Sequence, residues 1–170
     1  MLKFIGCFII FLCSTYIGFY FGEKYKNRSK QLNTLLKGIL FLNNEVIYSN
    51  TPIPEALRYI ALKMEDPFRD TIYRAAVRLE EGHASSIYEA FKEEYNKNSF
   101  FFNKEDINII KDFLLSLGET GVYGQDKLFN LTIENLKINC KSSEEMASKN
   151  VKMCRSLGVS IGAVIFIYLI

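Results

Sequence analysis

Side chains that could perform catalysis or bind a metal are sparse in this sequence. His83 is the only histidine and follows Gly82, a glycine placed to end a helix, so a position at a helix end or surface is favoured over a role as ligand or general base, which would need a partner group. The cysteines show no CxxC or other ligand-like spacing and predict neither a zinc site nor a disulfide framework. They are Cys7, Cys13, Cys140 and Cys154.

The sequence gives equally weak evidence for phosphate binding and for nucleic-acid binding. No glycine of residues 118–124 is followed by the lysine and threonine of a phosphate-binding loop, and the segment follows no predicted strand. A turn between helices explains these glycines better. The net charge is only +2, and basic residues of the middle region alternate with acidic ones, which gives no nucleic-acid signal. We therefore expect no enzymatic activity, no cofactor, no metal and no small-molecule substrate.

Two glycine pairs carry a clearer signal. Gly18 and Gly22 stand four residues apart near the amino terminus, and Gly158 and Gly162 stand four apart near the carboxyl terminus. This spacing leaves a groove on a helix into which a second helix can pack closely, although single matches of this kind also arise by chance. One pair in each terminal segment favours packing of the two helices on each other or on a neighbour. We expect a bulky residue at Gly162 to weaken assembly.

The elements that must position these glycines are two apolar runs, residues 4–22 and 157–170, which contain no ionisable side chain. About 20 apolar residues are needed for a helix to cross a bilayer. The first run has that length, and the second approaches it if Ser156 is included and Arg155 extends toward the headgroups. We predict transmembrane helices at residues 1–22 and 156–170. A cleaved signal peptide at the first run and a buried core helix at the second are the alternatives.

Basic residues next to the two apolar runs predict the orientation. They lie on the side of the insert, residues 23–155, whereas only Lys3 and the amino terminus lie on the other side. Because positive residues near membrane segments stay in the cytoplasm, we expect the insert to be cytoplasmic and the chain to reside in the cell membrane. The basic residues are Lys24, Lys26, Arg28, Lys30, Lys149, Lys152 and Arg155.

The insert has helical periodicity throughout. Apolar residues at steps of three and four predict a helix over residues 31–48, and Pro54 and Pro67 suit the first turns of two more, the second ending at Gly82. Ser86 and Asn103 are placed to start further helices, and a long final helix is expected from about Gln125. The fold class predicted is all-α, a helical bundle inserted between an N-terminal and a C-terminal transmembrane helix.

Residues along nearly the whole chain match, in register, those of a known protein family. The matching blocks are Ile5-Gly6, Ile17-Gly18-Phe19, Gln31-Leu32, Glu45, Tyr48, Thr51-Pro52, Glu55-Ala56-Leu57, Ala75-Ala76, Arg78-Leu79-Glu80, Gly82, Glu89-Ala90-Phe91, Leu117-Gly118, Gln125 and Arg155-Ser156-Leu157-Gly158. By these residues the chain resembles the stage III sporulation protein AB family of endospore-forming bacteria. One departure is Gly121, where the family usually has an acidic residue; Glu119 or Asp126 could take its place.

The resemblance implies a scaffold. The family's helical domain is similar to the cytoplasmic domains of the inner-membrane platform protein of type II secretion and type IV pilus systems. It implies a place in the mother-cell membrane at the forespore interface, in a secretion-like channel, with a secretion-type ATPase and other stage III sporulation membrane proteins as partners. A general membrane-anchored adaptor or signalling protein unrelated to sporulation is the alternative, and it would be favoured if the gene stood apart from a secretion-type ATPase gene.

Four residues are the candidates for partner binding. Thr51 and Glu55 flank one predicted turn, and Glu119 and Gln125 flank another. They combine matched family positions, or a neighbouring acidic residue, with expected exposure to solvent. The alternative is that they are helix caps, since threonine and proline at such positions have structural reasons of their own.

Overall fold

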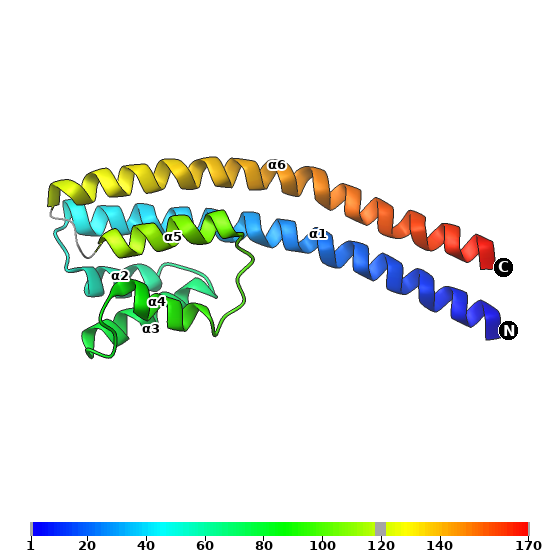
Figure 1. Cartoon of the computed structure of the whole chain (residues 1–170), viewed down its shortest axis with the longest axis horizontal. Coiled ribbons are helices and arrows are strands. Elements are labelled where there is room, and N and C mark those ends of the chain that lie inside the picture. Colours follow the sequence, from blue (N-terminus) through cyan, green and yellow to red (C-terminus); the bar gives the residue numbers. More distant parts are fainter. Residues whose placement is uncertain (1, 118–121, 170) are drawn as a thin grey trace. The chain divides into compact units, whose positions relative to one another are not determined.

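The computed structural model describes residues 2–117 and 122–169, and it describes their side chains except for those of residues 2–8, 10, 11, 122, 123, 166, 168 and 169. Within those residues the fold is all-α and contains no strand, which confirms the predicted fold class at that level. The elements are α1 (Leu2–Asn43), the π-helix η1 (Asn44–Tyr48), α2 (Ile53–Ala61), α3 (Phe68–Glu80), α4 (Ile87–Tyr95), α5 (Lys104–Leu117) and α6 (Val122–Leu169) (Figure 1).

The chain divides into two compact units. A terminal unit comprises residues 1–30 and 141–170, and a central unit comprises residues 31–140. Among the described residues, no helix is both long enough and apolar enough to cross a membrane. The predicted membrane helices at 1–22 and 156–170 lie partly outside the described side chains and stay predictions.

Short-range hydrogen bonds explain where α3 ends. Gly82 has a φ of +71°, a left-handed conformation that side chains with a Cβ rarely adopt. The amide of Gly82 donates to the carbonyl of Leu79 at 3.2 Å, and the amide of His83 donates to the carbonyl of Arg78 at 2.9 Å. These are the two bonds of a Schellman motif, and they confirm the predicted stop at Gly82.

The starts of α4 and α5 use reciprocal caps. The hydroxyl of Ser86 accepts from the amide of Glu89 at 3.2 Å, whereas the Glu89 carboxylate accepts from the amide of Ser85, one residue before the predicted partner. At α5 both halves of the box form: the amide of Asp106 donates to Asn103 Oδ1 at 2.8 Å, and the amide of Asn103 donates to Asp106 Oδ2 at 3.0 Å. The predicted start signals at residues 86 and 103 are confirmed.

The helix predicted over residues 31–48 has one feature that periodicity did not predict. Its last five residues, Asn44–Tyr48, form the wider π-helix η1, and the amide of Ser49 donates to the carbonyl of Asn44 at 3.2 Å. Asn50 then takes a φ of 52°, and the chain leaves the helix at the predicted position. The final helix α6 begins at Val122, three residues before Gln125.

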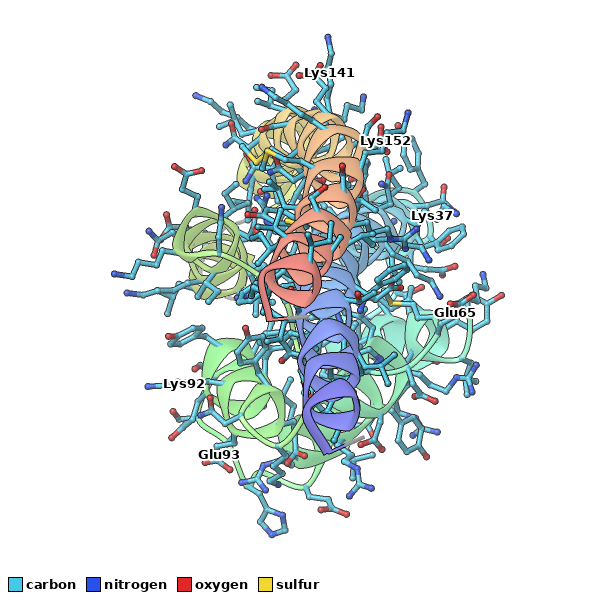
Figure 2. The ribbon with its side chains drawn as sticks, turned by 90° about the vertical axis from the view of Figure 1, so that its right-hand side faces the viewer. Lys37, Glu65, Lys92, Glu93, Lys141 and Lys152 are labelled. Atoms are coloured by element: carbon cyan, nitrogen blue, oxygen red, sulfur yellow. The ribbon has the colours of Figure 1, made fainter. Side chains whose placement is uncertain are left out.

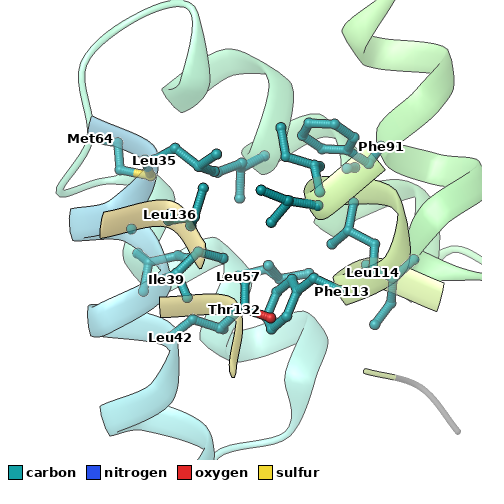
Figure 3. A pocket seen from close by; sticks show the side chains of 17 residues that line it. Leu35, Ile39, Leu42, Leu57, Met64, Phe91, Phe113, Leu114, Thr132 and Leu136 are labelled. Atoms are coloured by element: carbon teal, nitrogen blue, oxygen red, sulfur yellow. The ribbon is translucent and has the colours of Figure 1, made fainter. Parts of the chain in front are cut away.

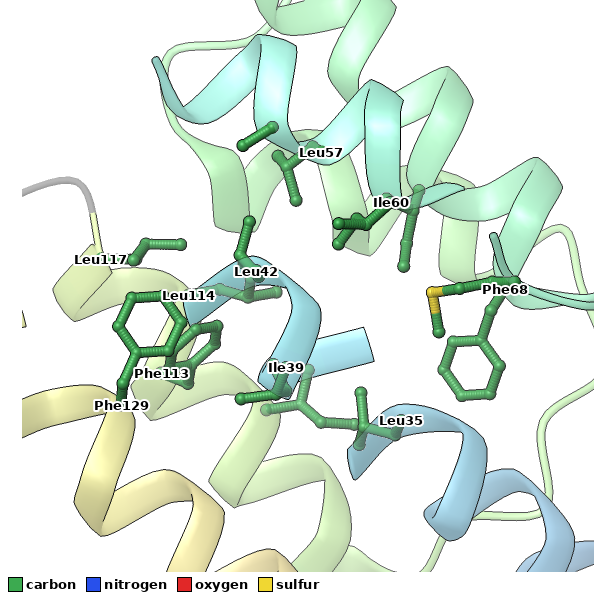
Figure 4. Packing of buried hydrophobic residues seen from close by; sticks show 14 of the residues in the cluster. Leu35, Ile39, Leu42, Leu57, Ile60, Phe68, Phe113, Leu114, Leu117 and Phe129 are labelled. Atoms are coloured by element: carbon green, nitrogen blue, oxygen red, sulfur yellow. The ribbon is translucent and has the colours of Figure 1, made fainter. Parts of the chain in front are cut away.

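The core of the central unit lies where all its helices meet. Leu35, Ile39 and Leu42 of α1 face Leu57 and Ile60 of α2 (Figure 4). On the other side Phe113 of α5 and Phe129 of α6 pack edge to face, with ring centroids 5.2 Å apart. Phe68, Ile60, Leu117 and Leu136 are among the side chains with under 3% exposure that complete this core. Charged side chains such as those of Lys92 and Glu93 on α4 point away from the core (Figure 2).

Candidate functional site

The terminal unit is built on a close backbone contact between α1 and α6. A Cβ on Gly18 would lie 2.6 Å from the carbonyl oxygen of Cys154 and 3.0 Å from Cα of Gly158. A Cβ on Gly158 would lie 3.0 Å from both Cα of Gly18 and the carbonyl oxygen of Ser14. Only glycine fits at these two positions without a shift of the backbone. The hydroxyl of Ser14 donates to the carbonyl of Gly158 at 2.9 Å across the same contact.

Of the other two predicted glycines, Gly22 occupies a looser position. A Cβ on Gly22 would lie 3.6 Å from Cα and the carbonyl oxygen of Val151, which is ordinary van der Waals contact. Gly162 is buried. An apolar groove of about 470 Å³ runs beside the Gly18 contact and is lined by side chains of both helices, among them Ile17, Phe21 and Leu157. The structure therefore places Gly18 and Gly158 together, and sets Gly22 against a valine.

A charged cluster lies on the same pair of helices, at the end of the predicted apolar runs. The guanidinium of Arg155 lies over the ring of Phe19, 4.9 Å from its centroid, and 3.8 Å from Glu23 Oε2. Glu23 also accepts from Lys26 Nζ at 3.2 Å. Glu23 is the only acidic residue among the basic ones of the predicted amino-terminal membrane boundary, and it pairs with Lys26 of that boundary and with Arg155 of the carboxyl-terminal one.

In the central unit, Thr51 closes the end of η1. Its amide donates to the carbonyl of Glu45 at 3.0 Å, and its hydroxyl lies 3.4 Å from Glu45 Oε2. Thr51 is half-buried, and these bonds engage it in the turn. Glu55, in the first turn of α2, is exposed.

The second pair of candidates is only partly described. Gln125 is half-buried in the first turns of α6, and Glu119 lies outside the described residues, as does Gly121. The structure thus offers Glu55 as the one freely exposed candidate among the three it describes.

The histidine and the cysteines were the residues considered for catalysis or metal binding. His83 is exposed on the turn after α3, with Nδ1 3.1 Å from Glu81 Oε2. Among the described residues, Cys13, Cys140 and Cys154 form no disulfide bond, and no three potential ligands cluster around a metal position.

An enclosed space in the central unit is too small for a cofactor. It measures about 40 Å³, against roughly 300 Å³ for the smallest typical ligand pockets. Leu35, Ile39 and Phe113 line it, and Thr132 is its single hydroxyl-bearing neighbour (Figure 3). We interpret it as a packing defect of the core.

A buried polar network was missed by sequence reasoning. Asp106 is 0% exposed, and besides capping α5 it accepts from Asn139 Nδ2 of α6 at 2.8 Å. The spacing of Asn103 and Asp106 gave the cap, but nothing local indicates a partner 33 residues further along. Burial raises the pKa of the nearby Tyr95 hydroxyl above its ordinary value, and the charge of Asp106 adds to that increase.

A second missed group is Glu94 of α4, which is 2% exposed. Its Oε1 accepts from Lys97 Nζ at 2.7 Å and lies 3.7 Å from Arg78 Nη1. Its Oε2 is buried and has no hydrogen-bond partner among the described residues. The sequence did not indicate this burial, because Glu94 lies in a helical stretch of mostly polar residues.

Comparison with known proteins gives a consistent result. The family model described as stage III sporulation protein AB matches residues 3–170. A curated relative, stage III sporulation protein AB of Bacillus subtilis (strain 168), is 26% identical over 171 residues, which cover 99% of this chain and 99% of that protein. A solved structure of stage III sporulation protein AB (SpoIIIAB) is similar with a TM-score of 0.63 and 22% identity, over 71% of this chain and 96% of that one.

Proposed function

The chain belongs to the stage III sporulation protein AB family, a family of sporulation proteins, and from that premise we propose that it is a membrane-anchored scaffold. In this proposal it is a component of a secretion-like channel between mother cell and forespore. It resides in the mother-cell membrane at the forespore interface and docks a cytoplasmic secretion-type ATPase together with other stage III sporulation membrane proteins.

The observation that carries the proposal is the extent of the family match. It spans residues 3–170 and thus includes both apolar ends as well as the helical bundle between them. A scaffold that joins a soluble partner to the bilayer needs both parts on one chain. The family resemblance implies that the bundle is similar to the cytoplasmic domains of the platform protein of type II secretion and type IV pilus systems, and this adds the expectation of an ATPase partner.

Packing within the terminal unit supports a membrane hairpin. The contact of Gly18 with Gly158 has the close backbone approach that small residues permit between membrane helices. The hydrogen bond from Ser14 to Gly158 is of the kind that holds such helices together. We infer that residues 1–22 and 156–170 span the membrane as a pair, with residues 23–155 in the cytoplasm.

The proposal assigns no catalytic step and no cofactor to this chain. Its described residues supply polar groups for capping, ion pairing and helix contact. In a scaffold the bundle would transmit position or force between the ATPase and the membrane helices. Chemical work would then belong to the ATPase.

A clean in-frame deletion in the native host tests the proposal. Engulfment and late forespore gene expression are scored separately, by microscopy and by a reporter. We expect engulfment to finish and late forespore expression to fail, with restoration by the wild-type gene in trans. Normal spore formation by the deletion strain would contradict the channel role.

A further inference from the structure

The outer face of α2 and α3 carries an open groove of about 470 Å³. Arg58 Nη1 donates to Glu80 Oε2 at 3.1 Å across it, which ties the two helices together along the groove. The groove is lined by Glu55, Arg58, Tyr59, Leu62, Tyr73 and Glu80. It includes Glu55, the partner-binding candidate that is freely exposed.

Large apolar side chains in this groove remain open to solvent. Leu62 is 69% exposed, Tyr59 48% and Tyr73 41%. Lys63 Nζ lies 3.9 Å from the ring centroid of Tyr59 and 5.4 Å from that of Phe41, which extends the exposed aromatic surface onto α1. Tyrosine and arginine are the residues that most often dominate binding energy at protein interfaces, and grouped exposed apolar side chains mark such interfaces.

A second groove, of about 440 Å³, meets the first at Tyr73, which lines both. It lies between α3 and α4, and Glu94 and Arg78 are among its lining residues. Both carry a buried atom without a hydrogen-bond partner among the described residues, Oε2 of Glu94 and Nε of Arg78. Neither atom is open to solvent, so a partner would meet the exposed charged side chains of this groove, those of Asp70, Arg74 and Lys97.

Charge indicates what kind of partner fits. The central unit, residues 31–140, has sixteen acidic and twelve basic residues and therefore an acidic excess. Arg58 is already paired with Glu80, whereas no ion pair to Glu55 occurs among the described residues. The α2–α3 groove is thus complementary to a protein surface that presents basic side chains beside apolar ones.

We propose that this face, the two grooves that meet at Tyr73, is the docking surface for the secretion-type ATPase, which places an apolar side chain against Tyr59, Leu62 and Tyr73 and a basic side chain opposite Glu55. This inference rests on the proposed function. It moves the expected contact from the Thr51 turn to the outward face of α2 and α3.

The test measures binding of the purified ATPase of the native host to the full-length chain in lipid nanodiscs. Leu62→Lys puts a cation where we expect a basic partner, and Tyr73→Ala removes the side chain that lines both grooves. Ile138→Lys is the matched control, because Ile138 lies on α6 outside both grooves and is 66% exposed, close to the value for Leu62. Melting temperatures of all variants check that the fold is retained.

We expect Leu62→Lys and Tyr73→Ala each to weaken binding by about tenfold or more, and Ile138→Lys to change it by less than about twofold. Glu55→Lys should also weaken binding, and the wild-type affinity should fall as salt is raised. If wild type binds the ATPase and Leu62→Lys and Tyr73→Ala bind equally well, the docking surface is refuted while the proposed function stands. If wild type binds no ATPase, both are overturned.

Discussion

The contact between Gly18 and Gly158 allows a sharp test with a matched pair of substitutions in one helix. Gly18→Ala adds a methyl group at the tightest point of the contact, and Gly22→Ala adds the same group one turn further along. The new carbon on Gly18 would lie 2.6 Å from the Cys154 carbonyl oxygen, whereas the one on Gly22 would lie 3.6 Å from its nearest neighbour, Val151. Only the first therefore requires the helices to move apart.

The size of the effect follows from these distances. Ordinary contact begins at 3.4 Å, so the helices must separate by about 0.8 Å to accommodate the methyl group on Gly18. A gap of roughly that size loses about a quarter to a half of the dispersion energy of each contact and stretches the hydrogen bond from Ser14. Overpacking of this kind costs about 1–3 kcal/mol. The gain in helix propensity from glycine to alanine is common to both variants and cancels in the comparison.

Thermal unfolding of the full-length chain in detergent micelles, followed by circular dichroism, gives the readout. We expect Gly18→Ala to be less stable than Gly22→Ala by about 1–3 kcal/mol, at roughly 2–4 °C of melting temperature per kcal/mol for a chain of this size. Gly158→Ala should behave like Gly18→Ala. Equal melting temperatures for Gly18→Ala and Gly22→Ala would refute the reasoning.

Gly38→Ala should stabilise the chain by up to about 1 kcal/mol in a urea titration, since alanine favours the helix. The new Cβ would lie 2.6 Å from the methyl end of Met64, which can move toward the adjoining cavity; a clear loss of stability would show that it cannot. Asp106→Ala should cost about 2–4 kcal/mol through the lost cap and the unpaired, half-buried side-chain amide of Asn139, whereas the exposed Asp112→Ala stays within about 0.5 kcal/mol. Hydrogen bonds from Ser85 hold the pKa of Glu89 below 4.5, so its stabilisation is present above that pH and is lost as pH falls through the lowered value. Glu89→Gln should therefore be less stable than wild type at neutral pH and equal to it in strong acid; a constant difference across that range would contradict this.

Local chemistry explains which boundaries were predictable. The turn at Gly82 and the cap of Asn103 with Asp106 depend on residues within six positions of each other, and their geometry is that expected from the spacing. The structure describes α6 from Val122, three residues before the predicted start, and residues 118–121 before it lie outside the described part of the chain. The π-helix η1 could not be predicted, because a one-residue widening of a helix leaves the apolar pattern nearly unchanged.

The candidate glycine contacts were likewise only partly predictable from the sequence. Glycine pairs could be read from the sequence, but their spacing says only that a groove exists on each helix. Which glycines meet depends on how the two helices are set against each other. That arrangement brought Gly18 to Gly158 and left Gly22 against Val151.

The amino-acid sequence by itself determined the all-α class, the helix ends with local caps, the apolar ends and the family of this chain, because each depends on residue type and short spacing. Only the tertiary structure decided that Asp106 is paired with Asn139, that Glu94 is buried, and that Leu62 and Tyr73 share an open groove. The physical reason is that burial and pairing depend on distances between residues far apart in the chain. Those distances are fixed by packing, which a pattern of residue types along one helix does not specify.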